Sequence, residues 1–132
     1  MCIRDRRLHS QWSPDLGCSP DELRREIAVS TTVMDPIPED RFLCAFGHIF
    51  AGGYSAGYYS YKWAEVLSAD AFAAFEEAGL DQEDTVRSIG ARFRDTVLSL
   101  GGSRSPSEVF EAFRGRQPSS DALIRHSGLQ AA

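Results

Sequence analysis

Apolar side chains recur at three- and four-residue steps along most of the chain, and proline and glycine separate the periodic segments. This spacing is typical of helices with one buried face. The clearest case predicts a helix from about residue 82 to residue 100, with apolar positions at Val86, Ile89, Phe93, Val97 and Leu100. No segment alternates apolar and polar residues long enough to predict a strand. The pattern therefore predicts an all-α fold.

The first third of the chain predicts two helical segments with loops after them. Residues 8–20 contain prolines and a glycine, and they are interpreted as the end of a helix that runs into a loop. Ser19 or Asp21 caps the next helix, which runs to about Thr32. Its expected buried residues are Leu23, Ile27 and, as a further candidate, Val29. The prolines at 36 and 38 end this region in an extended linker.

A long helix is expected over about 56–78, because alanine dominates its second half and neither proline nor a glycine after Gly57 interrupts it. Its large apolar residues lie on more than one side of the helix, at Trp63, Val66, Leu67, Phe72 and Phe75. That distribution is typical of a helix surrounded by other helices. Gly79 ends it.

Two shorter helices are expected near the C-terminus. One starts within 103–106, carries Phe110 and Phe113 on its apolar side, and ends at Gly115. Ser120 or Asp121 caps the other, which ends before the glycine at 128. Together with the earlier segments, these helices account for most of the chain.

Composition and charge narrow the class of protein. The 132 residues are enough for one small domain, with 42% hydrophobic and 25% charged residues as in ordinary globular proteins. The net charge of -5 argues against nucleic-acid binding, which requires a basic surface. Residues 42–61 carry no charge, but their glycines, hydroxyls and histidine make them too polar for a membrane span. The N-terminus lacks a signal-peptide pattern, and the three scattered cysteines indicate reduced thiols, so we expect a cytoplasmic protein.

The segment FGHIFAGGYSAGYYSY, residues 46–61, is the strongest candidate for chemistry. It contains all four tyrosines, four of the eleven glycines and His48. Gly52-Gly53 predicts a flexible turn, and Tyr58 and Tyr61 are three residues apart, so they share one face of the helix expected to begin near residue 56. A mobile loop beside two phenols can close on a ligand and donate hydrogen bonds to it. The alternative is a glycine-hinged packing corner with aromatic core residues.

Other chemical patterns are weak. None of the three histidines forms an H-E-x-x-H motif, so the sequence shows no zinc site. Cys44 and His48 are four residues apart but lack a third partner that would make them a catalytic or metal-binding set. Residues 53–57 spell G-x-S-x-G, yet no strand precedes them, so the match is interpreted as chance.

Four segments carry a family resemblance. They are HIFAGGYSAGYYSYKWAEVLSADAFAAFEEAG at 48–79, RFRDTVLSLGGS at 92–103, FEAFRGRQP at 110–118 and DALIRHSGL at 121–129. They resemble the C-terminal part of the thimet oligopeptidase and oligopeptidase A family of zinc metallopeptidases. The resemblance covers roughly residues 7–129 and occurs in the family's order.

The resemblance implies an all-helical, two-lobed zinc metallopeptidase that cuts short peptides in a deep channel. In this family the H-E-x-x-H helix and the third ligand, a glutamate, precede the matched part. We therefore expect residues 7–132 to be the C-terminal part of the catalytic domain, with upstream helices as its partners. Zinc would be bound by the full-length parent and not by this chain, which alone would be inactive. Residues 1–6 look foreign to the family pattern and are interpreted as a non-native leader.

The resemblance also implies roles for individual residues. Tyr61 is similar to the tyrosine that donates a hydrogen bond to the oxyanion of the tetrahedral intermediate, and His48 to the histidine near the scissile peptide. Tyr58 is similar to a second tyrosine that faces the substrate, and Gly52, Gly53 and Tyr54 to the mobile loop that closes over it. The alternative function is a non-catalytic helical module that binds peptides or acts as a scaffold. A requirement for zinc would distinguish the enzyme from the module.

Overall fold

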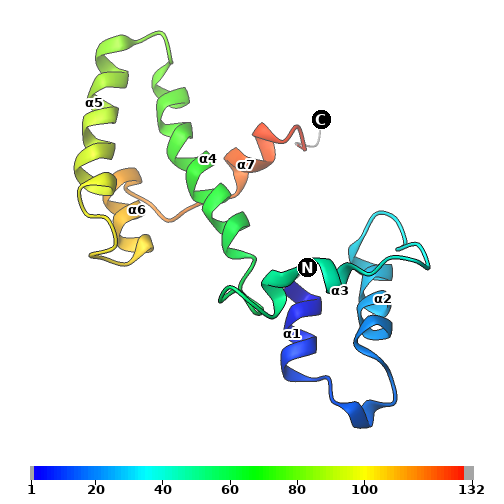
Figure 1. The fold of residues 1–132 in the computed structure, drawn as a ribbon. Helices are drawn as coiled ribbons and strands as arrows, with labels where there is room; N and C mark the ends of the chain where they lie inside the picture. The colour runs from blue at the N-terminus through cyan, green and yellow to red at the C-terminus, as the bar shows by residue number, and fades with distance from the viewer. Residues whose placement is uncertain (1, 130–132) are drawn as a thin grey trace. The chain divides into compact units, whose positions relative to one another are not determined.

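The computed structural model describes residues 2–129 of the protein (Figure 1). These residues form helices joined by turns and loops, and the described range contains no strand, so the all-α prediction is confirmed. The chain divides into two compact units between Tyr61 and Lys62. Each unit is described by itself.

The first unit is built on the pair α1 (Cys2–Ser10) and α2 (Pro20–Thr31), which are joined by a loop containing the short helix η1 (Pro14–Leu16) (Figure 1). Its core is formed by Leu8, Leu23, Ile27 and Ile49. Ser19 caps α2 in a reciprocal capping box with Glu22, which decides between the two expected caps. The cap accounts for the abrupt start of this helix after the loop.

The buried side of α2 agrees with the sequence at two positions and differs at one. Leu23 and Ile27 are buried, as expected. Val29 is 73% exposed, so its assignment to the buried side was wrong. It lies two residues past Ile27, about 200° around a helix, and therefore faces away from α1.

Helix α1 begins at Cys2 and includes residues 2–6, which the sequence analysis left out of the fold. Asp5 is fully buried, and the Nε of buried Arg4 donates to its Oδ1 at 2.7 Å. The Arg4 guanidinium also lies over the rings of Phe42 and Phe46, at 4.7 and 5.3 Å from their centroids. That these residues are a non-native leader stays a prediction; Met1 lies outside the described residues.

After α2, the chain passes through the proline linker into α3 (Phe42–Ala45) and η2 (Gly47–Ile49). The carbonyl oxygen of Ile49 is 2.6 Å from Nε2 of His9, which fastens η2 to α1. From residue 51 to residue 59 the chain forms turns. The long helix expected from residue 56 therefore starts four residues later, at Ser60. The cause is the turn closed by the Gly57 N–H on the carbonyl of Tyr54.

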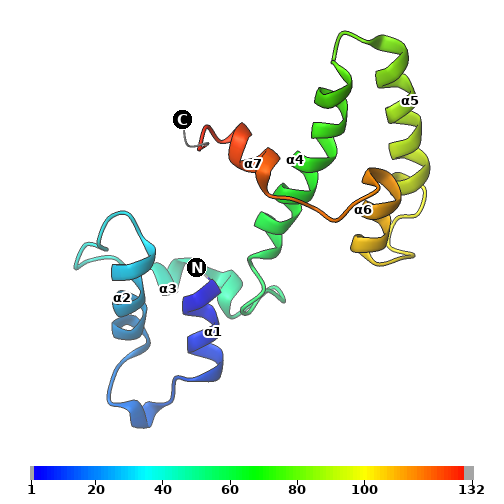
Figure 2. The same ribbon diagram turned by 180° about the vertical axis from the view of Figure 1, so that it is seen from behind.

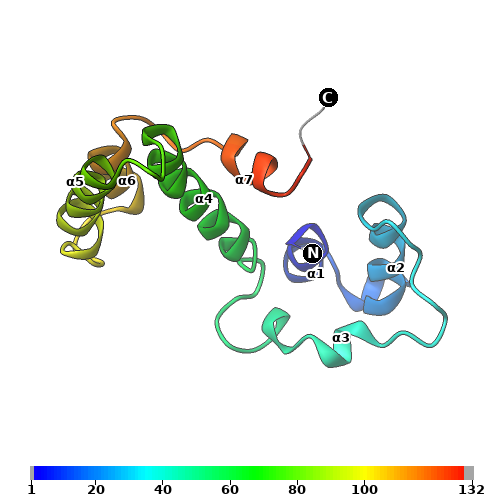
Figure 3. The same ribbon diagram turned by 90° about the horizontal axis from the view of Figure 1, so that it is seen from above.

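The second unit contains most of α4 (Ser60–Ala78), followed by α5 (Glu83–Phe93), the π-helical segment η3 (Arg94–Leu98), α6 (Pro106–Arg114) and α7 (Asp121–His126). Figures 1 and 3 show α4 with α5 and α6 on one side and α7 on the other. From behind, α5 and α6 lie next to each other at the C-terminal end of α5 (Figure 2). The single helix expected over 82–100 is wrong in its second half, because α-helical geometry ends at Phe93.

Small residues bring α7 against α4. Ala69 and Ala73 of α4 pack against Ala122 of α7, with Leu123 beside them. Ser105 caps α6 in a second capping box, and Gly115 ends it with φ +73°, as the sequence predicted. Ser120 precedes α7, although its side chain makes no capping hydrogen bond.

An ionic network on α4 anchors the segment between α6 and α7. Asp70 is 1% exposed and accepts two hydrogen bonds from Arg116, at 2.7 and 2.5 Å, and one from the Ser119 N–H at 2.7 Å. Arg114 lies 3.3 Å from the same carboxylate and forms a bidentate pair with Glu77. Burial alone would raise the pKa of Asp70, but these donors outweigh it and hold the pKa below the usual value.

Helix α7 has a second ionic anchor on α4. The Glu76 carboxylate pairs with Arg125 and lies 3.0 Å from Nε2 of His126. None of the helices within residues 2–129 combines the length and apolarity needed to cross a membrane.

Candidate functional site

The loop before α4 is shaped by residues that need unusual backbone angles. Gly52 and Gly53 have φ of +78° and +76°, in the left-handed region that glycine adopts at low cost. At Gly57, an added Cβ would stand 3.0 Å from the carbonyl oxygen of Tyr54. Ser55, between them, has φ +33°, which is uncommon for a residue with a side chain. These turns bring residues far along the loop back toward η2.

The result is a group of touching rings, the tyrosine cluster, made of His48, Tyr54, Tyr58 and Tyr61. The His48 ring lies 5.0 Å from that of Tyr54 and 5.2 Å from that of Tyr58, centroid to centroid. Tyr61 lies 5.4 Å from Tyr54 and 4.9 Å from Tyr58. Tyr58 belongs to the turn before α4 and not to the helix, yet its ring still adjoins that of Tyr61. All four predicted ring-bearing site residues are therefore brought together.

Two hydroxyls of the cluster are hydrogen-bonded to each other. Tyr54 Oη and Tyr61 Oη are 2.7 Å apart. The hydrogen bond to Tyr54 raises the pKa of Tyr61 above its usual value, with partial burial and the neighbouring phenols as smaller causes. Tyr61 therefore stays a neutral phenol throughout the neutral range. Since the pair uses one O–H for its own hydrogen bond, the other O–H is available to a ligand.

The cluster is open to solvent. Tyr61 is 48% exposed and His48 is exposed, while Tyr54 and Tyr58 are half-buried. Tyr59 is 63% exposed and makes no ring contact within residues 2–129. Of the four tyrosines, the three in the cluster thus share one environment, and Tyr59 lies outside it.

Phenylalanines that the sequence analysis did not single out support the cluster. The Phe46 ring contacts His48 at 5.4 Å and Tyr58 at 4.9 Å between centroids, and stacks on Phe42 at 5.2 Å. Arg4 covers the same two phenylalanines. Their four-residue spacing next to the glycine loop is a signal that could have found them, because that spacing places two side chains on one helical face.

The model of peptidase family M3 matches residues 3–129 of this chain, nearly its whole length. The chain belongs to peptidase family M3. The resemblance read from the sequence is confirmed, and the match begins at residue 3 where the resemblance began at about 7. The tyrosine cluster and the ionic network on α4 both lie within the M3 match.

Individual M3 proteins resemble the chain closely. It is 57% identical over 128 residues, 97% of its length, to the probable cytosolic oligopeptidase A of Arabidopsis thaliana. It is 58% identical over the same share to the chloroplastic and mitochondrial oligopeptidase A of that plant, and 48% identical over 96% to oligopeptidase A of Escherichia coli. The chain spans less than a fifth of the length of these M3 relatives, 16–18%. The names of the two plant proteins indicate different compartments, so the cytoplasmic location stays a prediction.

The remaining chemical candidates of this M3 chain lie apart from one another in function. The imidazole of His9 holds the Ile49 carbonyl, and that of His126 pairs with Glu76. Ser55 sits in a turn, with no strand in the described range to make it a nucleophile elbow. Within residues 2–129, no three histidine, cysteine, aspartate or glutamate side chains gather in a group that could hold a metal ion.

Proposed function

We propose that the chain is part of a peptidase that hydrolyses peptide bonds in short oligopeptides. Membership of peptidase family M3 supports this, as do the oligopeptidase A proteins that match nearly the whole chain. Because the chain spans less than a fifth of those proteins, the activity of the whole protein is a proposal. The chain's own contribution would be the tyrosine cluster.

Tyr61 is proposed as the donor to the oxyanion that forms when the peptide carbonyl is attacked. The observation that carries this role is its 2.7 Å hydrogen bond with Tyr54. With Tyr54 donating to the oxygen of Tyr61, the O–H of Tyr61 is free to point at a substrate, and hydrogen bonds in such a chain strengthen one another. A neutral phenol on the first turn of a helix is a donor set in place before the reaction, as oxyanion stabilisation requires.

The other members of the cluster are proposed to bind and orient the peptide. His48 and Tyr58 pack against each other and present a histidine nitrogen and a hydroxyl beside Tyr61. Gly52 and Gly53 place Tyr54 through backbone angles that few other residues adopt, so a change there moves the hydroxyl that contacts Tyr61. The glycine loop would close on the substrate and exclude water from it.

Zinc enters this proposal only through the resemblance. The described residues do not fit a zinc site, because no group of three potential ligands gathers among them. Zinc and its ligands would therefore belong to the upstream part of a full-length M3 protein. There the metal would polarise the peptide carbonyl. The residues of this chain would bind the substrate and stabilise charge.

The test is Tyr61→Phe in a full-length chimera, in which residues 3–129 replace the matching segment of E. coli oligopeptidase A. The change removes one oxygen and keeps the ring, so packing survives. Losing one preorganised donor costs about 2.7–4 kcal/mol, or roughly 10²–10³ in kcat. KM and the melting temperature should stay nearly unchanged, because the lost interaction exists mainly in the transition state. Steady-state kinetics on a short peptide and a thermal melt measure these quantities.

Tyr59→Phe is the matched control, since Tyr59 is exposed and lies outside the cluster. It should leave kcat, KM and stability as they are. If Tyr59→Phe abolishes turnover, or if Tyr61→Phe loses stability and keeps its rate, the proposed role is wrong. A non-catalytic module would show peptide binding with no turnover in the unaltered chimera.

A further inference from the structure

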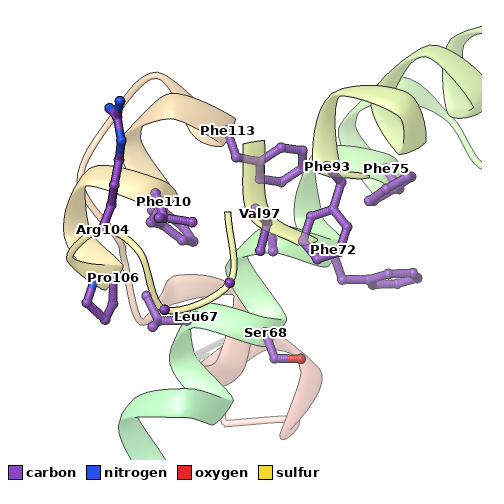
Figure 4. A pocket seen from close by; sticks show the side chains of 14 residues that line it. Leu67, Ser68, Phe72, Phe75, Phe93, Val97, Arg104, Pro106, Phe110 and Phe113 are labelled. Carbon is purple, nitrogen blue, oxygen red and sulfur yellow. The ribbon is translucent and has the colours of Figure 1, made fainter. Parts of the chain in front are cut away.

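The second unit contains a large apolar groove between α4, η3 and α6. Its volume is about 790 Å³, and its lining is drawn from all three elements and the loop after η3. Figure 4 shows Phe72, Phe93, Phe110 and Phe113 around this space, with Val97 beside them. Apart from Ser68, Arg104 and backbone groups, the lining side chains are apolar.

A space of this size is not a packing defect of a finished core. Protein interiors have few voids larger than a water molecule, and water gains little in an apolar space. The elements around the groove also lack the burial that their sequences call for. Helix α5 has apolar residues at helical spacing and no buried residue, and Phe72 on α4 is 47% exposed. The groove therefore lacks an occupant that would cover these side chains.

The M3 relatives indicate where the occupant comes from. More than four fifths of each relative lies outside the segment that this chain matches. One charged group at the groove narrows its chemistry: Arg104 lines the groove, and within residues 2–129 its guanidinium makes no hydrogen bond or ion pair. Figure 4 shows that guanidinium at the outer edge, away from the rings.

We propose that an apolar helix from the upstream part of the M3 polypeptide fills this groove and carries a carboxylate that pairs with Arg104. A helix is the expected element because every apolar face around the groove belongs to a helix or its connecting loop, and side chains of one helix pack into the grooves between others. The groove is thus the seat that attaches this segment to the rest of the protein. The proposal depends on membership of the M3 family and not on the tyrosine cluster.

The test uses Val97→Asp, with Leu98→Asp as its matched control on the same π-helical segment. Val97 lines the groove, whereas Leu98 does not and is 64% exposed. Each variant is made in the 132-residue chain alone and in the full-length chimera with E. coli oligopeptidase A. Amide hydrogen exchange of α5 and η3, helicity and oligomeric state are measured in both settings.

In the unaltered chimera, the amides of α5 and η3 should exchange at least about tenfold more slowly than in the chain alone, because burial suppresses local opening. Val97→Asp should remove this protection, or prevent the chimera from folding, while the isolated chain keeps its helicity. Leu98→Asp should preserve the protection. Equal exchange rates in the two unaltered proteins would overturn the proposal. So would a dimer of the isolated chain that Val97→Asp dissociates, since a second copy would then be the occupant.

Discussion

In residues 42–61 the polar groups of the tyrosine cluster lie at the surface, whereas on α4 the Asp70 carboxylate lies beneath it. The cluster is held by contacts between rings and by one hydroxyl pair. Asp70 is held by three charge-assisted hydrogen bonds and a nearby second guanidinium. The two regions therefore differ in what a lost polar group would cost.

The difference separates stability from chemistry. A buried carboxylate that has lost its partners has no water to replace them, so Asp70 and its arginines must remain paired for the fold. An exposed phenol can exchange a protein partner for water or for a substrate at little cost to the fold. The tyrosine cluster is thus free to bind a ligand, and the Asp70 network keeps α6 and α7 in place on α4.

The largest effect is expected for Asp70→Asn. Removing the charge leaves two arginines without their shared anion, and breaking such a buried pair costs about 3 kcal/mol or more of unfolding free energy. Urea unfolding of the chain measures the loss. Asp95→Asn is the control, because Asp95 pairs with Arg94 at the surface, with both side chains more than 60% exposed. If both variants unfold at the wild-type urea concentration, the network does not stabilise the second unit.

The same network predicts a pH dependence. Because the pKa of Asp70 is lower in the folded than in the unfolded chain, its contribution to stability is complete above the unfolded value of about 3.9. The contribution is lost as the pH falls from there through the folded pKa. The wild-type chain should lose stability in this acid range more steeply than Asp70→Asn, as measured by urea unfolding at a series of pH values. Parallel pH profiles would contradict the assignment.

A smaller effect on stability is expected for Gly53→Ala in the tyrosine cluster. Gly53 has φ +76° with open space around it, so alanine meets no clash but must adopt left-handed angles at a cost of about 1–2 kcal/mol. In the full-length chimera, kcat and KM should change together, because the loop no longer positions Tyr54. Gly47→Ala is the control: it lies in the same region with ordinary φ and open space. Unchanged kinetics for Gly53→Ala would make the loop a linker only.

The smallest effect on the fold is expected for Tyr54→Phe. Loss of the Tyr54 hydroxyl removes the main cause of the raised Tyr61 pKa, which should move back toward that of an ordinary phenol. An NMR titration of the Tyr61 ring in the 132-residue chain measures the shift, with Tyr59→Phe as the control. The melting temperature should hardly change. A Tyr61 pKa that is the same in both variants would contradict the hydroxyl pair as the cause.

Local sequence signals predicted helix ends better than helix interiors. The caps of α2 and α6 and the left-handed glycines at 79, 115 and 128 follow from side chains and backbone freedom within a few residues. The start of α4 was predicted four residues early, since the turn formed by Gly57 and Tyr54 overrides the helix-forming tendency of the residues after it. The π-helical η3 replaced the predicted helix because Ser99 bonds to Arg94, five residues back.

The candidate site was predicted in its residues more than in its geometry. The concentration of tyrosines and glycines in residues 46–61 led to the right segment, and the structure brings His48, Tyr54, Tyr58 and Tyr61 together. The support from Phe46 was missed, as was the hydroxyl pair of Tyr54 and Tyr61. A hydrogen bond across a left-handed turn depends on the path of the loop, which spacing along the chain does not specify.

By itself, the sequence determined the all-α class, the family resemblance, the helix caps and the segment that holds the tyrosine cluster. Each of these depends on residues close together in the chain or on long runs of identical letters. The tertiary structure decided that Asp70 is buried among Arg114, Arg116 and Ser119, that Val29 faces solvent, and that an apolar groove opens between α4 and α6. These features join residues up to 49 positions apart, and their energies arise only when folding removes water from between the groups.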